Sequence, residues 1–438
     1  MNQMLVIGAP RSGFTLLLTI LGITLKYKKV VYDKKQYMIN ELIKIASKEF
    51  KQAIYNFFEK KIDIDDLIYN GEFDLLVGGP KWIEGNEAVV RKYVGINGLN
   101  DFTFLIYLPK WSLNYHLMVH SHYNPQSWID DNYYNKYLKF SSIRDPRGVL
   151  NSATFSINAI TSEYITKYMP SFDENELREQ MALYKQTDID MFKGLVKWLK
   201  GYLDEFIEVK EYFNIIKWED MIDNSAKTIQ KIATIRGFTL SLDEAQNIWD
   251  GISYRNTIEF HKFNFRKGGG VVGEWKKRLT NHHLKILKDE GFDKYLEIFD
   301  YEEIEFFDEK DYTSFQKIVS DHITKGKIYN IIKDENLFIY NWNKSNISQT
   351  SHGFKRYERK GFIKIERSSL KDEKLVVEFE KYMNEKMEFI ATFLNDFYNS
   401  PEKFNELKDK YQRLLSDSSE EEFKKAKEFL DGKIEIKE

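Results

Sequence analysis

Cysteine is absent from this chain of 438 residues, which excludes disulfides and thiolate chemistry and suits a reducing compartment. No apolar run approaches the ~20 residues of a membrane-spanning helix. The formal net charge is only −3, which argues against the broad basic surface of a nucleic-acid-binding protein. The N-terminus leads straight into a short apolar run and leaves no room for a signal peptide. We therefore expect a cytoplasmic protein with no membrane span and no nucleic-acid partner.

The composition is that of a globular protein, with 42% hydrophobic and 30% charged residues. Residues 1–300 alternate short apolar runs with segments of helical periodicity, which predicts an α/β domain with a central parallel sheet flanked by helices. We expect parallel strands at Met4–Ile7, Asp74–Gly78, Phe102–Leu108, Lys139–Ile143 and Asn214–Trp218. We expect helices at Phe14–Leu25, Asn40–Ala46, Asn86–Tyr93, Arg147–Ser152, Met191–Val209, Ala226–Ile235 and Ser241–Asp250.

Two further regions differ from this pattern. The polar stretch Ser121–Tyr137 predicts a loop that covers a site. Residues 301–438 predict a separate, mainly α-helical extension, in which Phe362–Glu366 forms a strand and apolar residues recur at helical spacing from Leu375 to Leu394. We expect these C-terminal helices to serve in homo-oligomerisation or in binding an acceptor. The predicted division of the chain therefore lies at residue 300.

A glycine loop follows the first apolar run, with the sequence Gly8-Ala9-Pro10-Arg11-Ser12-Gly13-Phe14-Thr15. A strand, a glycine loop and a helix in this order direct backbone amides and the positive end of the helix dipole at an anion. Nucleoside triphosphatases carry lysine at the position of Phe14 and use it on the β- and γ-phosphates. Phe14 has no charge, and the nearest cation is Arg11. The loop therefore predicts a site for a phosphate-like group that differs from an ATP or GTP hydrolase site.

Three later segments carry charge at the ends of predicted strands or on a glycine-rich loop. Arg144-Asp145-Pro146-Arg147 follows an apolar run, and Ser152 lies eight positions after Arg144. Trp218-Glu219-Asp220 follows another apolar run. The third segment is Arg266-Lys267-Gly268-Gly269-Gly270-Val271-Val272-Gly273-Glu274-Trp275-Lys276.

Together, over residues 1 to 280, these four segments resemble the sulfotransferases that use 3′-phosphoadenosine 5′-phosphosulfate (PAPS). The resemblance implies a phosphate-loop-like α/β fold, PAPS as co-substrate, 3′-phosphoadenosine 5′-phosphate (PAP) as product, and no metal. It implies 5′-phosphosulfate contacts from Arg11, Ser12, Gly13, Phe14 and Thr15, 3′-phosphate contacts from Arg144 and Ser152, an aromatic near the adenine at Trp218, and late-loop contacts from Arg266, Lys267 and Gly268.

Sulfuryl transfer needs in-line positioning and cations at the leaving phosphate. Arg11 is expected to act there because a guanidinium forks onto two oxygens and stays charged. Lys81, after the run Val77-Gly78-Gly79-Pro80, resembles the family lysine that approaches the bridging oxygen. Lys110 is a rival because it also follows a predicted strand.

The catalytic base stays open between two groups of residues. Ile83 stands where cytosolic members of the family carry histidine, and the carboxylate of Glu84 comes one position later. The alternative is the cluster of His116, His120 and His122, of which the first two share a helical face at a spacing of four. No zinc-binding pattern accompanies these histidines, so we expect no metal.

Some positions depart from the family pattern. Phe14 replaces a hydroxyl residue, Leu16 stands where some members have tryptophan, and the late loop has two extra residues before Gly273. These departures keep two alternatives open, namely a non-catalytic nucleotide-binding or assembly protein and, less well supported, a phosphate-loop kinase. The sequence leaves the acceptor as a small molecule or a carbohydrate.

Overall fold

The computed structural model describes residues 3–27, 52–54, 56–57, 59, 64–65, 74–76, 87–96, 102–109, 118–122, 125–130, 132–155, 174–252, 270–329, 363–367, 377–379, 381–386, 388 and 392. The chain divides into two compact units, each built from separate segments. Unit 1 comprises Met1–Met4, Gly22–Ser121 and Phe354–Glu438, and unit 2 comprises Leu5–Leu21 and His122–Gly353. These units do not follow the division at residue 300, which stays a prediction.

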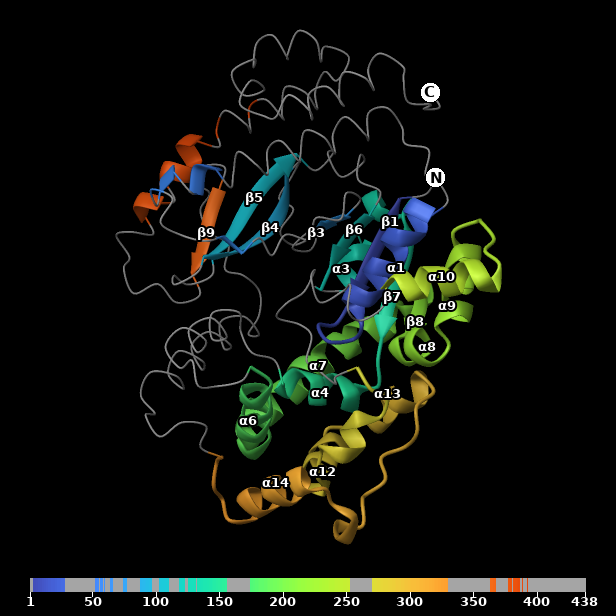
Figure 1. Ribbon diagram of the computed structural model, residues 1–438, viewed down its shortest axis with the longest axis vertical. Helices are drawn as coiled ribbons and strands as arrows, with labels where there is room; N and C mark the ends of the chain where they lie inside the picture. Colours follow the sequence, from blue (N-terminus) through green and yellow to red (C-terminus); the bar gives the residue numbers. More distant parts are fainter. Residues whose placement is uncertain are drawn as a thin grey trace. The chain divides into compact units, whose positions relative to one another are not determined.

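The sheet of unit 2 contains three neighbouring strands, drawn in Figure 1. They are β1 (Met4–Gly8), β7 (Leu138–Ile143) and β8 (Asn214–Lys217), in the order β1-β7-β8. Strands β7 and β8 are parallel, with Phe140 opposite Asn214 and Ile143 opposite Lys217. Every residue of β1 is buried, as expected for a parallel strand covered on both faces. The register places the residues that follow β7 and β8 next to each other, so two of the predicted motifs meet at this edge.

Helices flank these strands, which confirms the predicted α/β class (Figure 1). The α-helices are α1 (Phe14–Tyr27), α3 (Pro125–Asp130), α4 (Pro146–Thr154), α6 (Glu174–Thr187), α7 (Ile189–Val209), α8 (Trp218–Asp223), α9 (Ser225–Ile235), α10 (Leu242–Ile252), α12 (Asn281–Asp289), α13 (Asp293–Ile298) and α14 (Ser314–Thr324). Short 310 helices are η3 (Asn132–Tyr134), η4 (Lys210–Tyr212), η5 (Glu274–Lys277) and η6 (Glu309–Asp311).

Helix α7 shows how the sequence produces one of these helices. Asp188 caps its first turn by accepting a hydrogen bond from the Met191 amide at 3.0 Å. Apolar side chains recur at three- and four-residue spacing and bury one face, and these are Phe192, Val196, Leu199, Leu203 and Phe206. The opposite face carries lysine and glutamate. The predicted helix at Met191–Val209 is therefore confirmed, with its start two residues earlier.

Unit 1 holds a parallel pair and an antiparallel sheet. Strand β3 (Asp74–Leu76) pairs in parallel with β6 (Met118–Ser121). The antiparallel sheet has the order β2-β4-β5-β9, with bounds Ile64–Asp65, Glu87–Ile96, Phe102–Pro109 and Ile363–Arg367. Strand β9 confirms the predicted C-terminal strand and joins it to β5 over the register Phe102↔Arg367 to Ile106↔Ile363.

The structure corrects three predictions. The predicted helix at residues 86–93 is strand β4, whose Val89, Val90 and Val94 have the β-branched side chains that strands favour. Strand β5 was expected to be parallel, but it is antiparallel to both β4 and β9. The expected loop at residues 121–137 contains α3 and η3, and it buries Trp128 edge-on against Tyr134 at 4.7 Å between ring centroids.

The predicted C-terminal helix is confirmed for its described residues, 377–379, 381–386, 388 and 392. Phe379 and Met383 are fully buried there, and the Phe379 ring lies 4.7 Å from that of Phe57. The predicted helix at residues 40–46 lies outside the described residues.

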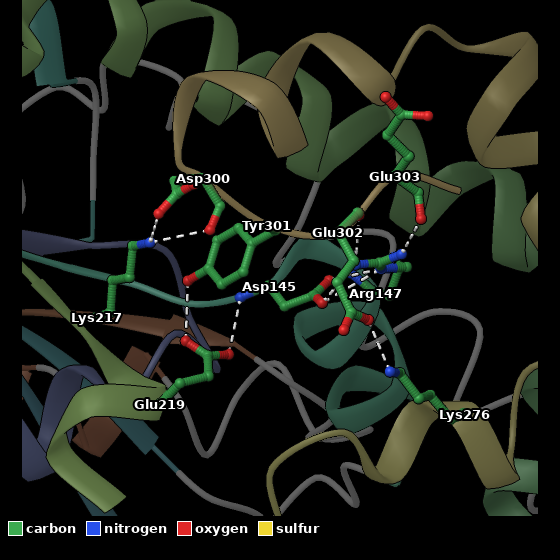
Figure 2. A network of polar contacts seen from close by, with 9 residues as sticks. All are labelled: Asp145, Arg147, Lys217, Glu219, Lys276, Asp300, Tyr301, Glu302 and Glu303. Atoms are coloured by element: carbon green, nitrogen blue, oxygen red, sulfur yellow. Dashed lines mark hydrogen bonds and ion pairs between the residues drawn. The ribbon is translucent and has the colours of Figure 1, made fainter. Parts of the chain in front are cut away.

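A polar network joins the ends of β7 and β8 to the chain after α13 (Figure 2). The Arg147 guanidinium forms a bidentate ion pair with Asp145 and donates to the carbonyls of Glu302 and Glu303 at 2.9 and 3.0 Å. Asp145 also caps α4 by accepting from the Arg147 amide at 2.9 Å. Pro146 occupies the first helical turn, where its missing N–H costs nothing. Within the sequence Arg-Asp-Pro-Arg, Asp145 and Pro146 therefore begin helix α4, and Asp145 and Arg147 form a buried ion pair.

Glu219 extends this network from α8. It accepts the Asp145 amide at 3.1 Å and the Tyr301 hydroxyl at 2.8 Å (Figure 2). Burial raises the pKa of the Glu219 carboxyl, and these hydrogen bonds and Arg144 oppose that rise. A neutral amide of the same shape can keep both partners without burying a charge.

We predict that Glu219→Gln changes the free energy of unfolding by less than about 1 kcal/mol, whereas Glu219→Leu lowers it by about 2–4 kcal/mol. Leucine leaves the Asp145 amide and the Tyr301 hydroxyl without their acceptor. Because the folded-state pKa of Glu219 is raised, the wild type should lose stability relative to Glu219→Gln as the pH rises above the ordinary glutamate pKa of about 4. Urea unfolding of the three proteins measures both effects, and equal losses in both variants would contradict this role.

Candidate nucleotide-binding site

The glycine loop connects β1 to α1 at the edge of the sheet in unit 2. Arg11 and Gly13 adopt left-handed backbone conformations, with φ of 72° and 86°. For arginine this conformation is strained, and such strain gathers at functional loops. The Ser12 hydroxyl donates to the Ala9 carbonyl at 2.7 Å, and the Gly13 carbonyl accepts from the Leu17 amide to begin α1. The loop therefore presents the N-terminus of a 14-residue helix, which suits an anion.

Two glycines allow this loop to lie close against the ends of β7 and β8. A Cβ on Gly8 would lie 2.4 Å from Ser142 Oγ, and a Cβ on Gly13 would lie 2.4 Å from Trp218 Cδ1. Ser142 also hydrogen-bonds the Ser12 hydroxyl, with 2.8 Å between the two oxygens. The loop is thus fixed by contacts with both neighbouring strand ends and does not depend on its own turns alone.

Arg144 follows β7 and lies against this loop. Its guanidinium carbon is 3.7 Å from the centre of the Trp218 ring, and its Nη1 donates to the Arg11 carbonyl at 3.4 Å. The side chain is buried, and its buried Nε has no hydrogen-bond partner among the described residues. Burial lowers the pKa of Arg144, and the nearby carboxylates of Glu219 and Asp145 oppose that shift. A buried arginine whose Nε donor is unused among the described residues is suited to binding an anion.

Phe14 and His122 form a pair next to the loop. Phe14 is buried, and its ring centroid lies 4.2 Å from that of the His122 imidazole. His122 Nδ1 lies 2.8 Å from the Gly8 carbonyl oxygen, which can only accept a hydrogen bond. Nδ1 therefore carries the proton, and in the neutral ring the basic lone pair is on Nε2. The Phe14 side chain packs against the histidine, so this residue offers an anion only its backbone amide.

Two more cations lie near the C-terminal end of α4. Lys185 Nζ donates to the Ala153 carbonyl at 3.2 Å, and Arg178 Nη1 donates to the Phe155 carbonyl at 3.4 Å. Both side chains come from α6 and are buried. Burial, and then the charges of Arg11 and Arg178, hold the pKa of Lys185 well below its usual value. Arg11 therefore lies in a region that already carries positive charge.

The structure brings together five of the predicted nucleotide contacts in unit 2: Arg11, Ser12, Gly13, Arg144 and Trp218. Thr15 and Ser152 are partly exposed on the first turn of α1 and near the end of α4. His120 is buried on β6 in unit 1. The predicted residues Lys81, Glu84, His116, Arg266, Lys267 and Gly268, and the rival Lys110, lie outside the described residues.

Two residues near this loop were not predicted from the sequence. Ser142 carried no signal beyond its small size, and Lys185 belongs to a helix that was not predicted. His122 was named only as part of a histidine cluster. The structure places His122 at the loop because its Nδ1 hydrogen-bonds the Gly8 carbonyl. This contact joins residues 114 positions apart, so no local spacing in the sequence indicates it.

Within the described ranges, no group of three or more His, Cys, Asp or Glu side chains could hold a metal ion. Among the described helices, none combines the length and the apolar character needed to cross a membrane.

Part of this chain matches a known protein family. Residues 115–300 match the family model of the sulfotransferase domain, which confirms the resemblance found in the motifs. None of the curated proteins matches the chain. A similar solved structure is mouse sulfotransferase SULT7A1 complexed with PAP, at 12% identity, covering 73% of this chain and 88% of that chain. Its TM-score of 0.32 is too low to carry an argument.

We predict that Gly13→Ala lowers the free energy of unfolding by about 1–3 kcal/mol, because the new Cβ meets the Trp218 ring and the left-handed backbone becomes strained. Gly201→Ala in α7 is the matched control, since a Cβ there meets no atom within 4 Å. Alanine should stabilise that exposed helical position by up to about 1 kcal/mol. Thermal unfolding compares the two variants, and a Gly13→Ala protein as stable as the wild type would show that the loop and Trp218 are not packed together.

Proposed function

The chain carries a sulfotransferase domain over residues 115–300, and on that premise we propose that it transfers a sulfuryl group from PAPS to a hydroxyl or amine of a small-molecule or carbohydrate acceptor. The observation that carries the proposal is the buried Arg144 guanidinium beside the glycine loop, whose Nε finds no partner in the part of the chain that the structure describes. A doubly anionic nucleotide needs cations at two separate positions. Arg11 in the loop and Arg144 at the end of β7 supply two.

The glycine loop would hold the 5′-phosphosulfate. Its amides and the N-terminus of α1 favour the charge of the leaving phosphate without a metal ion. Arg11 adds a charged, forked donor, and Ser12 and Thr15 add hydroxyls. Lys81 stays the proposed residue at the bridging oxygen, on the strength of the family resemblance.

Arg144 would bind the 3′-phosphate together with Ser152, two turns further along α4. Charge-assisted hydrogen bonds from a guanidinium to phosphate are short and strong. Arg266, Lys267 and Gly268 on the late loop would complete this end of the nucleotide. PAP would then be the product that leaves the site.

In the transfer, the acceptor oxygen or nitrogen forms a bond to sulfur while the bond from sulfur to the bridging oxygen breaks and its electron pair stays on the phosphate. The acceptor loses one proton to a base. Glu84, His116 and His120 stay candidates from the sequence, and His122 is the candidate that the geometry favours. Its Nδ1–H is held by the carbonyl of Gly8, where the glycine loop begins, so the neutral ring carries its basic lone pair on Nε2.

Phe14 fits this assignment. Its ring packs on the His122 imidazole and restricts its rotation. The departure from a hydroxyl residue at this position would thus exchange a phosphate contact for the support of a base. We further propose a cytoplasmic protein that acts on a soluble acceptor and assembles, where it does so, through its C-terminal helices.

The proposed donor is tested by calorimetric titration with PAP in EDTA, with ATP and Mg²⁺ as the comparison. We expect micromolar binding of PAP without metal, and we expect Arg144→Ala to weaken it by about 2–4 kcal/mol, or roughly 30- to 1,000-fold. Glu219→Gln is the control because it changes charge next to Arg144 while keeping its own hydrogen-bond partners. Metal-dependent binding of ATP in place of PAP would sink the proposal and favour a kinase.

The proposed base is tested by His122→Asn, which keeps a donor for the Gly8 carbonyl but lacks a basic nitrogen. We predict that transfer to the acceptor slows by about 100- to 10,000-fold, while PAP affinity changes less than about threefold. Glu84→Gln is measured alongside. If Glu84→Gln abolishes transfer and His122→Asn keeps full activity, the base is Glu84 and His122 only supports the loop.

A further inference from the structure

Trp218 lies between two parts of the site that are far apart in the sequence. The register of β7 and β8 ends with Ile143 opposite Lys217, so the next residues, Arg144 and Trp218, are neighbours. The Arg144 guanidinium stacks on the Trp218 ring at 3.7 Å. Trp218 Cδ1, Cγ and Cβ lie 2.4–3.0 Å from the point where a Cβ on Gly13 would be. The tryptophan therefore contacts the loop and the arginine at once, and it is only 6% exposed.

The stack on Trp218 is a close restraint on the Arg144 guanidinium. One hydrogen bond holds this group, from Nη1 to the Arg11 carbonyl at a long 3.4 Å, and the described residues give Nε none. A guanidinium is attracted to the face of an indole ring, whereas a hydrogen bond of 3.4 Å is weak. The carboxylates of Glu219 and Asp145 attract Arg144 through their charge, and the Trp218 ring supplies the flat surface on which its guanidinium stacks.

Arg147 provides the contrast within the same motif. Its guanidinium also lies over an indole, at 4.0 Å from the Trp275 ring centre, and Trp275 is buried to a similar degree. Five hydrogen bonds to Asp145, Glu302 and Glu303 already fix this arginine. Removing Trp275 should therefore cost packing but leave Arg147 in place.

We propose that Trp218 is a positioning residue that sets the 3′-phosphate selectivity of the site, because it holds the Arg144 guanidinium at a fixed place relative to the phosphate loop. The inference rests on the proposed function, since it takes PAP as the ligand. It differs from the role that the family resemblance implies, in which the aromatic ring lies near the adenine. The two roles predict different losses when the ring is removed, because PAP and 5′-AMP share the adenine and differ in the 3′-phosphate.

The experiment measures the dissociation constants of PAP and 5′-AMP for the full-length wild type, Trp218→Leu, Trp218→Phe and Trp275→Leu. We expect Trp218→Leu to lower the preference for PAP over 5′-AMP by about tenfold, through loss of PAP binding. Phenylalanine keeps an aromatic face, so Trp218→Phe should keep the preference within about threefold of the wild type. Trp275→Leu should lower the melting temperature but leave the preference unchanged.

The outcomes distinguish a failure of the proposed function from a failure of the positioning role of Trp218. A wild type that binds PAP no better than 5′-AMP overturns the proposed function itself. If the wild type prefers PAP and Trp218→Leu weakens both ligands equally, the ring contacts the adenine and the positioning role is wrong. A matching loss of preference in Trp275→Leu would mean that general destabilisation causes the effect. If Trp218→Leu does not fold, Trp218→Phe decides, and a preference that falls by more than about tenfold despite an intact aromatic face contradicts the proposal.

Discussion

The buried ion pair between Asp145 and Arg147 is the interaction on which this site depends. It ties the start of α4 to the carbonyls of Glu302 and Glu303, which lie more than 150 residues further along the chain. Glu219 joins the end of β8 to the same network through the Asp145 amide. Breaking a buried pair leaves an uncompensated charge, which is far more costly than losing a surface contact. This network holds the ends of β7 and β8 together. The glycine loop, Arg144 and Trp218 all pack against these strand ends.

Arg144 lies one residue before Asp145 and three before Arg147, but its contacts are the opposite of theirs. Its neighbours in the motif are satisfied, whereas its own Nε is buried without a partner among the described residues. Native structures rarely leave such a group unused unless a ligand or a catalytic role explains it. The motif therefore combines an arginine that is fully engaged in the structure with one whose Nε keeps an unused donor among the described residues, and the difference appears only in their contacts.

The strands around the site were predicted correctly because each is a short apolar run that ends in glycine or charge, as at β1, β7 and β8. The helix predicted at residues 86–93 was wrong, since pairing with β5 outweighed the local pattern and formed β4. The aromatic segment with Trp128 and Tyr134 looked like a covering loop, and burial turned it into core. Contacts between distant segments, which a local pattern does not contain, decided these cases.

By itself, the sequence determined the chemistry available: a glycine loop with Arg11, a second arginine at Arg144, and a phenylalanine in place of the phosphate-loop lysine. It also determined the α/β class, because apolar periodicity is a local property of the chain. The tertiary structure alone decided that every nitrogen of the Arg147 guanidinium is hydrogen-bonded whereas Arg144 Nε has no partner among the described residues. It also decided that the Gly8 carbonyl fixes the proton on His122 Nδ1 and that Trp218 lies between Gly13 and Arg144. These depend on strand register and on close approach of backbones, which arise only when segments far apart in the sequence pack together.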